Sequence, residues 1–299
     1  MPETSVPAGV ESEPHIARLP ARAGRVLAIV LTASVLGFVL LIASRGVTPF
    51  HFDPATFAAS FAAGLFAQLV DGALGMGYGV TSNALLLASG LPPAAATATV
   101  HVAKSFTGAA SGLSHWRLGN VDKRIFGRLI VPGIIGTLIG VYVVTSVDGR
   151  TIRPWISAYL LGMGVFILVR AFHAIHIALP DLRKLFPVAL VGGFADSVGG
   201  GGWGPVVTTT LIGSGHEPRT TIGSVNAAEF IVSLASGLSF TVLVGIQHWE
   251  SVAGLVLGGV VIAPFAAGLT HRFPRRAMMV AVGLLISGLS IFSIVRAFA

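Results

Sequence analysis

Two stretches of this chain place an acidic residue at the head of a glycine-rich run, in sequence that is otherwise apolar. The first reads Asp71-Gly-Ala-Leu-Gly-Met-Gly-Tyr-Gly79, and the second reads Asp196-Ser-Val-Gly-Gly-Gly-Gly-Trp-Gly204. Such glycine runs favour unwound backbone, which is tolerated at membrane depth only where it is buried in protein or lines a cavity. Paired breaks of this kind are typical of substrate sites in secondary transporters.

A helix that restarts after each glycine run, at about Val80 or Pro205, would suit a small anion. Its first N–H groups and the positive end of its dipole would point into the break, and the glycine loop can add further N–H groups. Hydroxyl and amide side chains stand in the expected first turns; the alternative is that they only cap the helix. We therefore expect substrate contacts from Gly75, Gly77, Gly79, Thr81, Ser82, Asn83, Gly200, Gly202, Gly204 and Thr208.

Two further pairs of polar residues stand at equivalent positions of the two copies. Lys104 and Glu229 are 125 residues apart, and each lies about ten residues into an apolar segment. That is roughly 15 Å along a helix, which is mid-membrane, so an ion pair between them would relieve two costly charges. His101 and Asn226 lie one turn earlier on the same face. We expect His101, Lys104 and Asn226 to contribute to the substrate site.

The acids Asp71, Asp196 and Glu229 have the wrong sign to contact an anion directly. Three roles remain open for the two motif aspartates: a proton carrier, a partner for a buried cation, or an acceptor that holds the N–H groups of the glycine loop. If transport is coupled to an ion, protons or sodium are the candidates, and these three acids are the expected carriers.

The two copies belong to a longer internal repeat. Residues 71–113 and 196–238 align without a gap and are identical at 14 positions. Self-similarity at this spacing predicts a duplicated architecture. The expected units are a polar tail at 1–24, a first helix and loop at 25–54, and two repeats at 55–179 and 180–299. The expected unbroken helices are 26–44, 94–114, 124–146, 154–177, 219–245, 251–270 and 276–298, with broken segments at 55–89 and 185–214.

Composition indicates an all-α integral membrane protein. Hydrophobic residues make up 54% of the chain and charged residues only 10%, and the mean hydropathy is +0.84. The net charge of +7 comes from bases spread over short loops rather than gathered into a patch, so no nucleic-acid partner is expected. The chain contains no cysteine, its histidines are not matched by clustered acids, and no metal or other cofactor is expected.

Loop charge predicts how the broken segments cross the bilayer. With a cytoplasmic N-terminus and two full crossings, nine Lys/Arg lie on each side; with two re-entrant hairpins, fourteen lie inside and four outside. The positive-inside rule favours the hairpins. Each repeat then has a hairpin plus three helices, an odd number of passes, which makes the two repeats inverted in topology after one extra N-terminal helix. The alternative is a parallel duplication with kinked helices.

The chain resembles the sulfite exporter TauE/SafE family, also called the four-TMS sulfate/tungsten uptake permeases. The resemblance rests on the duplicated acid-plus-glycine motif, on the Ser-Gly-x-x-Pro patterns at 89–93 and 214–218, and on the repeated Ala-Ser-Gly at 110–112 and 235–237. It spans about residues 55–297. The resemblance implies transport of small sulfur-containing anions such as sulfite or organosulfonates, often as export.

The leading hypothesis is therefore a secondary transporter of the inner cell membrane, with a small anion and the lipid bilayer as its partners. An anion channel or a proton- or sodium-coupled uptake permease are the alternatives, and a homo-oligomer is compatible with the sequence. ATP is not expected to drive it, because the chain has no phosphate-binding GxxxxGK[ST] loop. A remote alternative is an intramembrane enzyme that uses a serine such as Ser111 or Ser236, activated by His101 or another base.

Overall fold

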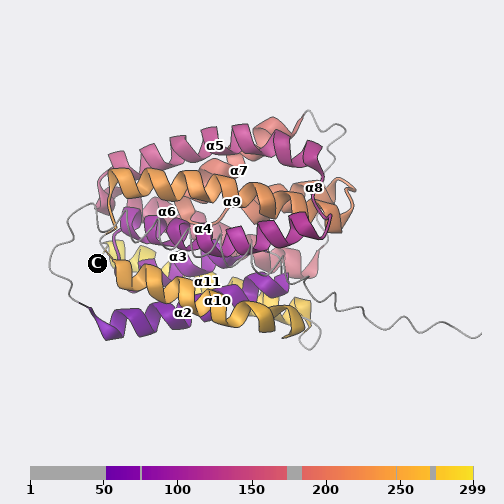
Figure 1. Cartoon of the computed structure of the whole chain (residues 1–299). Coiled ribbons are helices and arrows are strands. Elements are labelled where there is room, and N and C mark those ends of the chain that lie inside the picture. The colour runs from indigo at the N-terminus through magenta and orange to yellow at the C-terminus, as the bar shows by residue number, and fades with distance from the viewer. Residues whose placement is uncertain (1–51, 75, 174–183, 247, 270–273, 299) are drawn as a thin grey trace, which may run out of the picture.

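The structure is a computed structural model that describes residues 52–74, 76–173, 184–246, 248–269 and 274–298 (Figure 1). Regular structure in these residues is helical throughout, which confirms the all-α expectation. The polar tail, the helix expected at 26–44 and Gly75 lie outside the described residues. Four described helices are long and apolar enough to cross a membrane: Lys123–Ser146, Gly149–Phe172, Pro218–Leu243 and Arg276–Phe298.

The helices follow the expected order, with both broken segments in place. The first part contains α2 (Pro54–Leu74), α3 (Tyr78–Ala88), α4 (Pro93–Arg117), α5 (Lys123–Ser146) and α6 (Gly149–Phe172). The second contains α7 (Leu185–Gly199), the π-helical turn η2 (Gly204–Thr208), α8 (Thr209–Gly213), α9 (Pro218–Leu243), α10 (Trp249–Leu269) and α11 (Arg275–Phe298). The breaks fall at Gly77 and Gly200, whose φ angles of 115° and 73° are readily adopted only by glycine.

Acidic caps fix where several helices begin. Asp148 accepts hydrogen bonds from the backbone N–H groups of Arg150 (2.9 Å) and Thr151 (3.2 Å), so α6 starts at Gly149. The predicted start at residue 154 was wrong, because Pro154 lies inside the helix rather than at its first position. The predicted end at residue 177 was also too late, since α6 ends at Phe172.

The α2–α3 segment returns to the end of the bundle at which it began. At that end, the rings of Phe52 before α2 and Trp249 of α10 lie 5.5 Å apart. The carbonyl of Leu87, near the end of α3, accepts a 2.6 Å hydrogen bond from Arg153 in the second turn of α6. In Figure 1 the starts of α2 and α4 lie on the same side of the bundle.

The α7–η2–α8 segment does the same at the opposite end. There the N–H of Asp122, which caps α5, donates to Ser224 near the start of α9 at 2.8 Å. α7 runs in the same direction as α5, because Gly136 packs against Leu190 and Gly140 packs one turn further against Phe194. The chain therefore enters at the end where α5 and α9 begin, breaks in the interior, and goes back.

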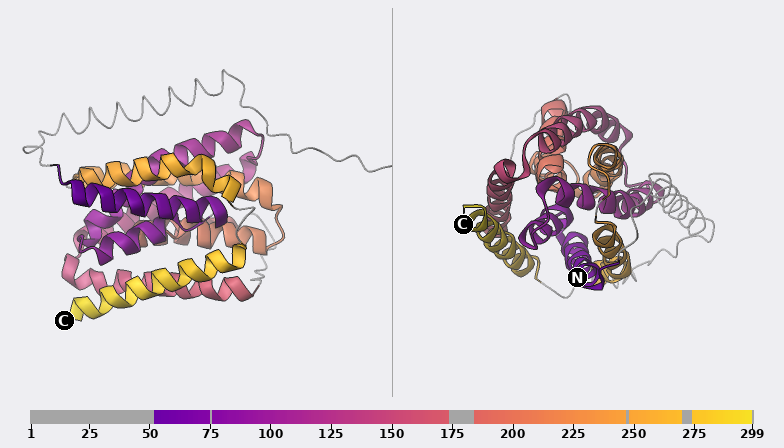
Figure 2. Two further views of the ribbon diagram at one scale, coloured as in Figure 1. Left: turned by 90° about the horizontal axis from the view of Figure 1, so that it is seen from below. Right: turned by 90° about the vertical axis from the view of Figure 1, so that its left-hand side faces the viewer.

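Each broken segment packs along a helix of the other half of the chain (Figure 2). α2 lies along α10 and α7 along α5, while α4 pairs with α9 and α6 with α11. Glycines permit these close approaches: a Cβ added at Gly258 of α10 would collide with the Phe61 carbonyl of α2, and one at Gly193 of α7 with the Gly133 carbonyl of α5.

The two glycine runs meet in the middle of the bundle. A Cβ added at Gly79 would collide with the carbonyl of Gly200, and one at Gly201 would collide with the N–H of Val80. Trp203, fully buried beside this contact, donates its indole N–H to the carbonyl of Val225 at 3.2 Å. The motifs are thus joined backbone to backbone, with polar side chains gathered around them.

Candidate functional site

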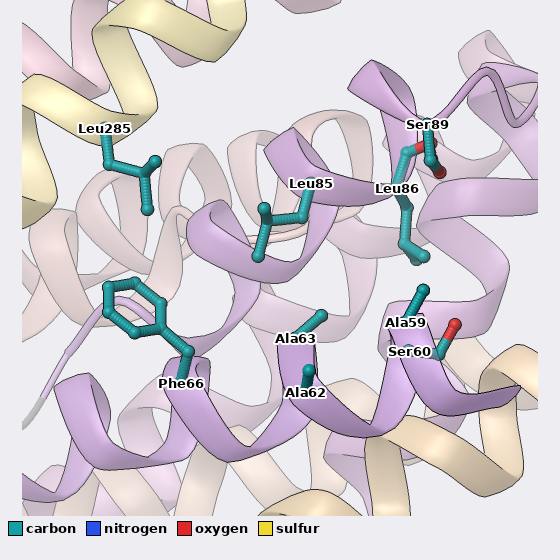
Figure 3. Close-up of a pocket in the computed structure, with 9 residues that line it drawn as sticks. All are labelled: Ala59, Ser60, Ala62, Ala63, Phe66, Leu85, Leu86, Ser89 and Leu285. Carbon is teal, nitrogen blue, oxygen red and sulfur yellow. Dashed lines mark hydrogen bonds between the residues drawn. The ribbon is translucent and has the colours of Figure 1, made fainter. Parts of the chain in front are cut away.

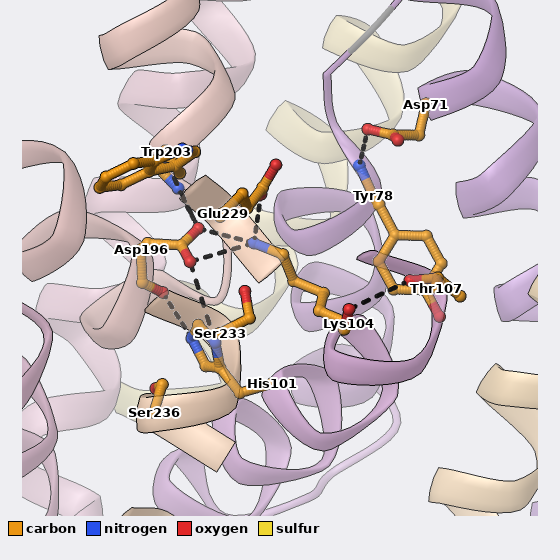
Figure 4. Close-up of polar contacts among 12 residues, drawn as sticks. Asp71, Tyr78, His101, Lys104, Thr107, Asp196, Trp203, Glu229, Ser233 and Ser236 are labelled. Carbon is orange, nitrogen blue, oxygen red and sulfur yellow. Dashed lines mark hydrogen bonds and ion pairs between the residues drawn. The ribbon is translucent and has the colours of Figure 1, made fainter. Parts of the chain in front are cut away.

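Lys104 of α4 lies at the centre of a buried ionic cluster (Figure 4). Its ammonium group lies 2.8 and 3.0 Å from the two carboxylate oxygens of Asp196 on α7, and 2.8 Å from Glu229 on α9. The predicted ion pair between Lys104 and Glu229 is therefore present. The second partner, Asp196, fills one of the roles left open for it, that of a partner for a buried cation. Its pairing with Lys104 was not predicted, because nothing in the spacing of 92 residues indicates the contact.

Both motif aspartates hold the N–H groups of the helix that restarts after the break. Asp71 accepts a hydrogen bond from the N–H of Tyr78 at 3.2 Å. Asp196 accepts from the N–H groups of Gly202 (2.9 Å) and Trp203 (3.3 Å). Of the three roles left open, that of loop acceptor is the one seen for both acids. The helix N-termini expected to bind an anion are thus already engaged by carboxylates of the protein.

A cavity of about 300 Å³ lies between the two motifs. Its charged lining consists of one cation and three acids: Lys104, Asp71, Asp196 and Glu229. Glycines of both motifs, parts of α2 and one face each of α4 and α9 complete its wall. The other lining residues are Gln68, Met76, Gly77, Tyr78, Gly79, Val80, Thr107, Gly108, Ser111, His115, Gly201, Gly204, Pro205, Ile222 and Asn226.

The structure separates the expected substrate residues into two groups. Those that line the cavity are Gly77, Gly79, Lys104, Gly204 and Asn226, together with the three acids. The lining does not include Thr81, Ser82, Asn83, His101, Gly200, Gly202 or Thr208, and Gly75 lies outside the described residues. The cavity therefore brings together backbone of the motifs and charged side chains, rather than the hydroxyl-rich turns.

The small hydroxyl and amide side chains near the start of α3 face the packed interior. Thr81, Ser82 and Asn83 are fully buried, and the Asn83 amide donates to Thr97 at 3.3 Å. α3 begins at Tyr78, two residues earlier than expected, so Tyr78, Gly79 and Val80 occupy the position at the cavity. Thr81, Ser82 and Asn83 do not line the cavity.

The imidazole of His101 supports Asp196 rather than the cavity wall. Its Nε2 lies 2.9 Å from the Asp196 backbone carbonyl, and its Nδ1 lies 3.8 Å from the carboxylate. The serines of the remote enzyme hypothesis have other neighbours: Ser111 contacts Asn226 at 3.2 Å and Ser236 contacts Ser197 at 3.3 Å. No hydrogen bond joins His101 to either side chain among the described residues.

Five polar residues of the cavity were not predicted to belong to the substrate site: Gln68, Tyr78, Thr107, Ser111 and His115. Thr107 and Ser111 follow Lys104 at spacings of three and seven residues, so they share its helix face. That periodicity was the signal available in the sequence. Gln68 lies one turn before Asp71 on α2 and was open to the same reasoning.

A second cavity of about 360 Å³ differs in character (Figure 3). It lies among α2, α3 and α11, and apolar side chains such as Phe66, Leu85 and Leu285 dominate its wall. Its lining contains no ionisable side chain. Of these two cavities, the one between the motifs is the one that offers a charged solute a counter-charge.

Comparison with known proteins places these features in a family. The family described as sulfite exporter TauE/SafE matches residues 60–293, which include both motifs and the whole ionic cluster. The chain belongs to the TauE/SafE family. The match confirms the resemblance seen in the duplicated motifs.

A curated TauE/SafE-type relative supports the same assignment. The chain is 41% identical over 230 residues to the "Probable membrane transporter protein YtnM" of Bacillus subtilis (strain 168), covering 74% of this chain and 76% of the relative. No solved structure matches the chain. Family and relative point to a membrane transporter with several passes rather than to an enzyme.

Proposed function

We propose that this TauE/SafE protein is a secondary transporter that exports a small sulfur-containing anion, sulfite or an organosulfonate, across the inner membrane. The observation that carries the proposal is the cavity of about 300 Å³ that contains Lys104 between the two broken segments. This volume is at the lower limit for small-molecule sites, which suits an anion of a few heavy atoms. The family description supplies the substrate class.

The proposal includes two repeats of inverted topology, with the N-terminus in the cytoplasm. Its support is the pattern of helix packing. In the repeat, α2 corresponds to α7 and α5 corresponds to α10, so exchanging the two halves converts the α2–α10 pair into the α7–α5 pair. The α4–α9 and α6–α11 pairs are each converted into themselves. The two broken segments also start from opposite ends of the bundle. A pseudo-two-fold axis in the membrane plane would produce both features.

Export needs no coupling ion when the cell interior is negative. Moving one negative charge outward gains about 2.3 kcal/mol per 100 mV of membrane potential. Uptake would need a proton or a sodium ion. One observation favours coupled uptake as the second candidate function: the cavity lining contains three acids, Asp71, Asp196 and Glu229, and one permanent cation, Lys104. An incoming anion would add to that excess of negative charge unless a cation came with it.

Transport by the purified full-length protein in proteoliposomes tests the proposal. The vesicles are offered labelled sulfite, sulfate, thiosulfate, ethanesulfonate and sulfoacetate, with and without a pH gradient. We expect saturable flux of at least one anion, accelerated by the same anion on the opposite side. The matched variant combines Lys104→Met with Asp196→Asn and Glu229→Gln, which leaves no unpaired charge in the cluster, and it should lose this flux.

The same assay separates the alternatives. Unitary currents without counterflow would indicate a channel, and flux that requires an inward pH gradient would indicate coupled uptake. Flux no greater than in protein-free vesicles for every anion of the series would contradict the proposed function.

A further inference from the structure

We propose that Glu229 is a built-in competitor of the transported anion: its carboxylate occupies the position on Lys104 that the substrate takes, and the anion binds when Glu229 takes up a proton and withdraws. The inference rests on the proposed function. It identifies protonation of Glu229 as the event that frees the anion position on Lys104. It concerns the same cavity and applies whichever way the anion is moved.

The ammonium group of Lys104 has no donor to spare. An ammonium group carries three N–H donors. In the structure these face three carboxylate oxygens, two from Asp196 and one from Glu229, at 2.8 to 3.0 Å. An anion that binds Lys104 must therefore displace one of the two carboxylates.

Glu229 is the carboxylate that can leave. Asp196 is fully buried and is held by two backbone N–H groups in addition to Lys104. The side chain of Glu229 is 23% exposed, lines the cavity and, among the described residues, has the ion pair with Lys104 as its one polar contact. Displacing Asp196 would also break its hydrogen bonds to the N–H groups of Gly202 and Trp203, whereas displacing Glu229 breaks its single contact with Lys104.

Charge balance requires that Glu229 leave as a neutral acid. The titratable groups that line the cavity with it are Lys104 and His115 on α4, Asp196 on α7, Asp71 on α2 and Tyr78 on α3, while η2 and α8 contain no ionisable side chain. The ionisable side chains of α5, which also packs against α9, do not line the cavity; they are Lys123, Arg124, Arg128 and Tyr142. A displaced carboxylate would remain in the same small cavity as the bound anion, and two like charges at close range in a poorly solvated site repel strongly. A proton on the carboxylate removes this repulsion, so the site takes up one proton for each anion that it binds.

Calorimetry on the purified full-length protein tests the exchange. The probes are ethanesulfonate and sulfate, because neither changes its charge between pH 5.5 and 8.5. Titrations in two buffers of different ionisation enthalpy give the number of protons taken up per anion. For the wild-type protein we expect one proton, and an affinity that falls about tenfold per pH unit where Glu229 is ionised.

Glu229→Gln removes the competitor and leaves Lys104 balanced by Asp196, so the fold should persist. This variant should bind the anion without proton uptake, with an affinity independent of pH, and at least tenfold more tightly than the wild type at pH 8.5. Glu229→Asp keeps a titratable group and should keep the proton uptake. His115→Gln is the matched control for the imidazole that also lines the cavity, and it should also take up one proton.

The possible failures are distinguishable. Wild-type proton uptake that persists in folded Glu229→Gln would overturn the inference while leaving the transporter proposal intact, and so would binding by the wild type without any proton uptake. A folded wild-type protein that neither binds nor transports any anion of the series would contradict the proposed function itself, and the inference with it.

Discussion

At the scale of single residues, Lys104 joins three helices that are distant in sequence. Its ammonium group pairs with carboxylates of α7 and α9, so α4 is tied to both at one buried point. The equivalence of Lys104 and Glu229 in the repeat was sufficient to predict one of these contacts. A buried cation was one of the partners left open for Asp196, but its identity as Lys104 was not predictable, because the contact depends on how far α7 extends into the bundle before it breaks, and no residue pattern encodes that depth.

Removing the cation alone should destabilise the protein. Lys104→Met leaves two carboxylates without their counter-charge in the interior, a change that costs roughly 3–5 kcal/mol for a fully buried pair. The triple variant Lys104→Met, Asp196→Asn, Glu229→Gln has no charge left in the cluster and should recover much of the loss. Thermal unfolding in detergent, followed by size-exclusion chromatography, measures both. A single variant as stable as the wild type would contradict this view of the cluster.

Exchanging the charges tests the role of Asp196. Lys104→Glu combined with Glu229→Lys restores one ion pair but sets a carboxylate at position 104 against Asp196, so two like charges face each other. We therefore expect the exchanged pair to be no more stable than Lys104→Met. Adding Asp196→Asn removes the repulsion and should raise the unfolding temperature; an exchanged pair that is stable without this third change would show that Asp196 contributes little.

At the scale of elements, the helix breaks were predictable and the destination of their side chains was not. The glycine runs located both breaks to within a few residues, because no other residue adopts the φ of Gly77 or Gly200 so readily. Thr81, Ser82 and Asn83 were expected at the substrate site but do not line the cavity, because a shift of two residues in the start of α3 rotates each side chain by about 200° around the helix axis. Periodicity gives the existence of a helix more reliably than its first residue.

The contact between the breaks should not tolerate even one methyl group. Gly79→Ala places a Cβ where the Gly200 carbonyl lies, so the two motifs would have to separate. Gly162→Ala in α6 is the matched control, because a Cβ there meets nothing within 4 Å. We expect Gly79→Ala to lower the yield of folded protein severalfold and Gly162→Ala to leave it unchanged, as measured by chromatography of the solubilised membranes. Equal yields would mean that the breaks can move apart.

At the scale of the whole molecule, the proposed orientation in the membrane rests on loop charge and on the ends to which the broken segments return. Leu118 after α4 and Val147 after α5 lie at opposite ends of the bundle, and both are exposed. In this cysteine-free chain, a membrane-impermeant thiol reagent applied to intact spheroplasts should label Val147→Cys. It should label Leu118→Cys only after permeabilisation. Labelling of position 118 from outside would reverse the assigned orientation and contradict the re-entrant arrangement.

The packing of each broken segment against the opposite half also bears on how the chain is made. When α4 enters the bilayer, the acids that neutralise Lys104 have not yet been synthesised, since Glu229 follows 125 residues later. At 5–20 residues per second, a ribosome needs roughly 6 to 25 s to supply them. During that interval the first half must keep an uncompensated lysine close to water or to lipid headgroups. Insertion of α4 to its final depth is therefore expected to wait for the second half of the chain.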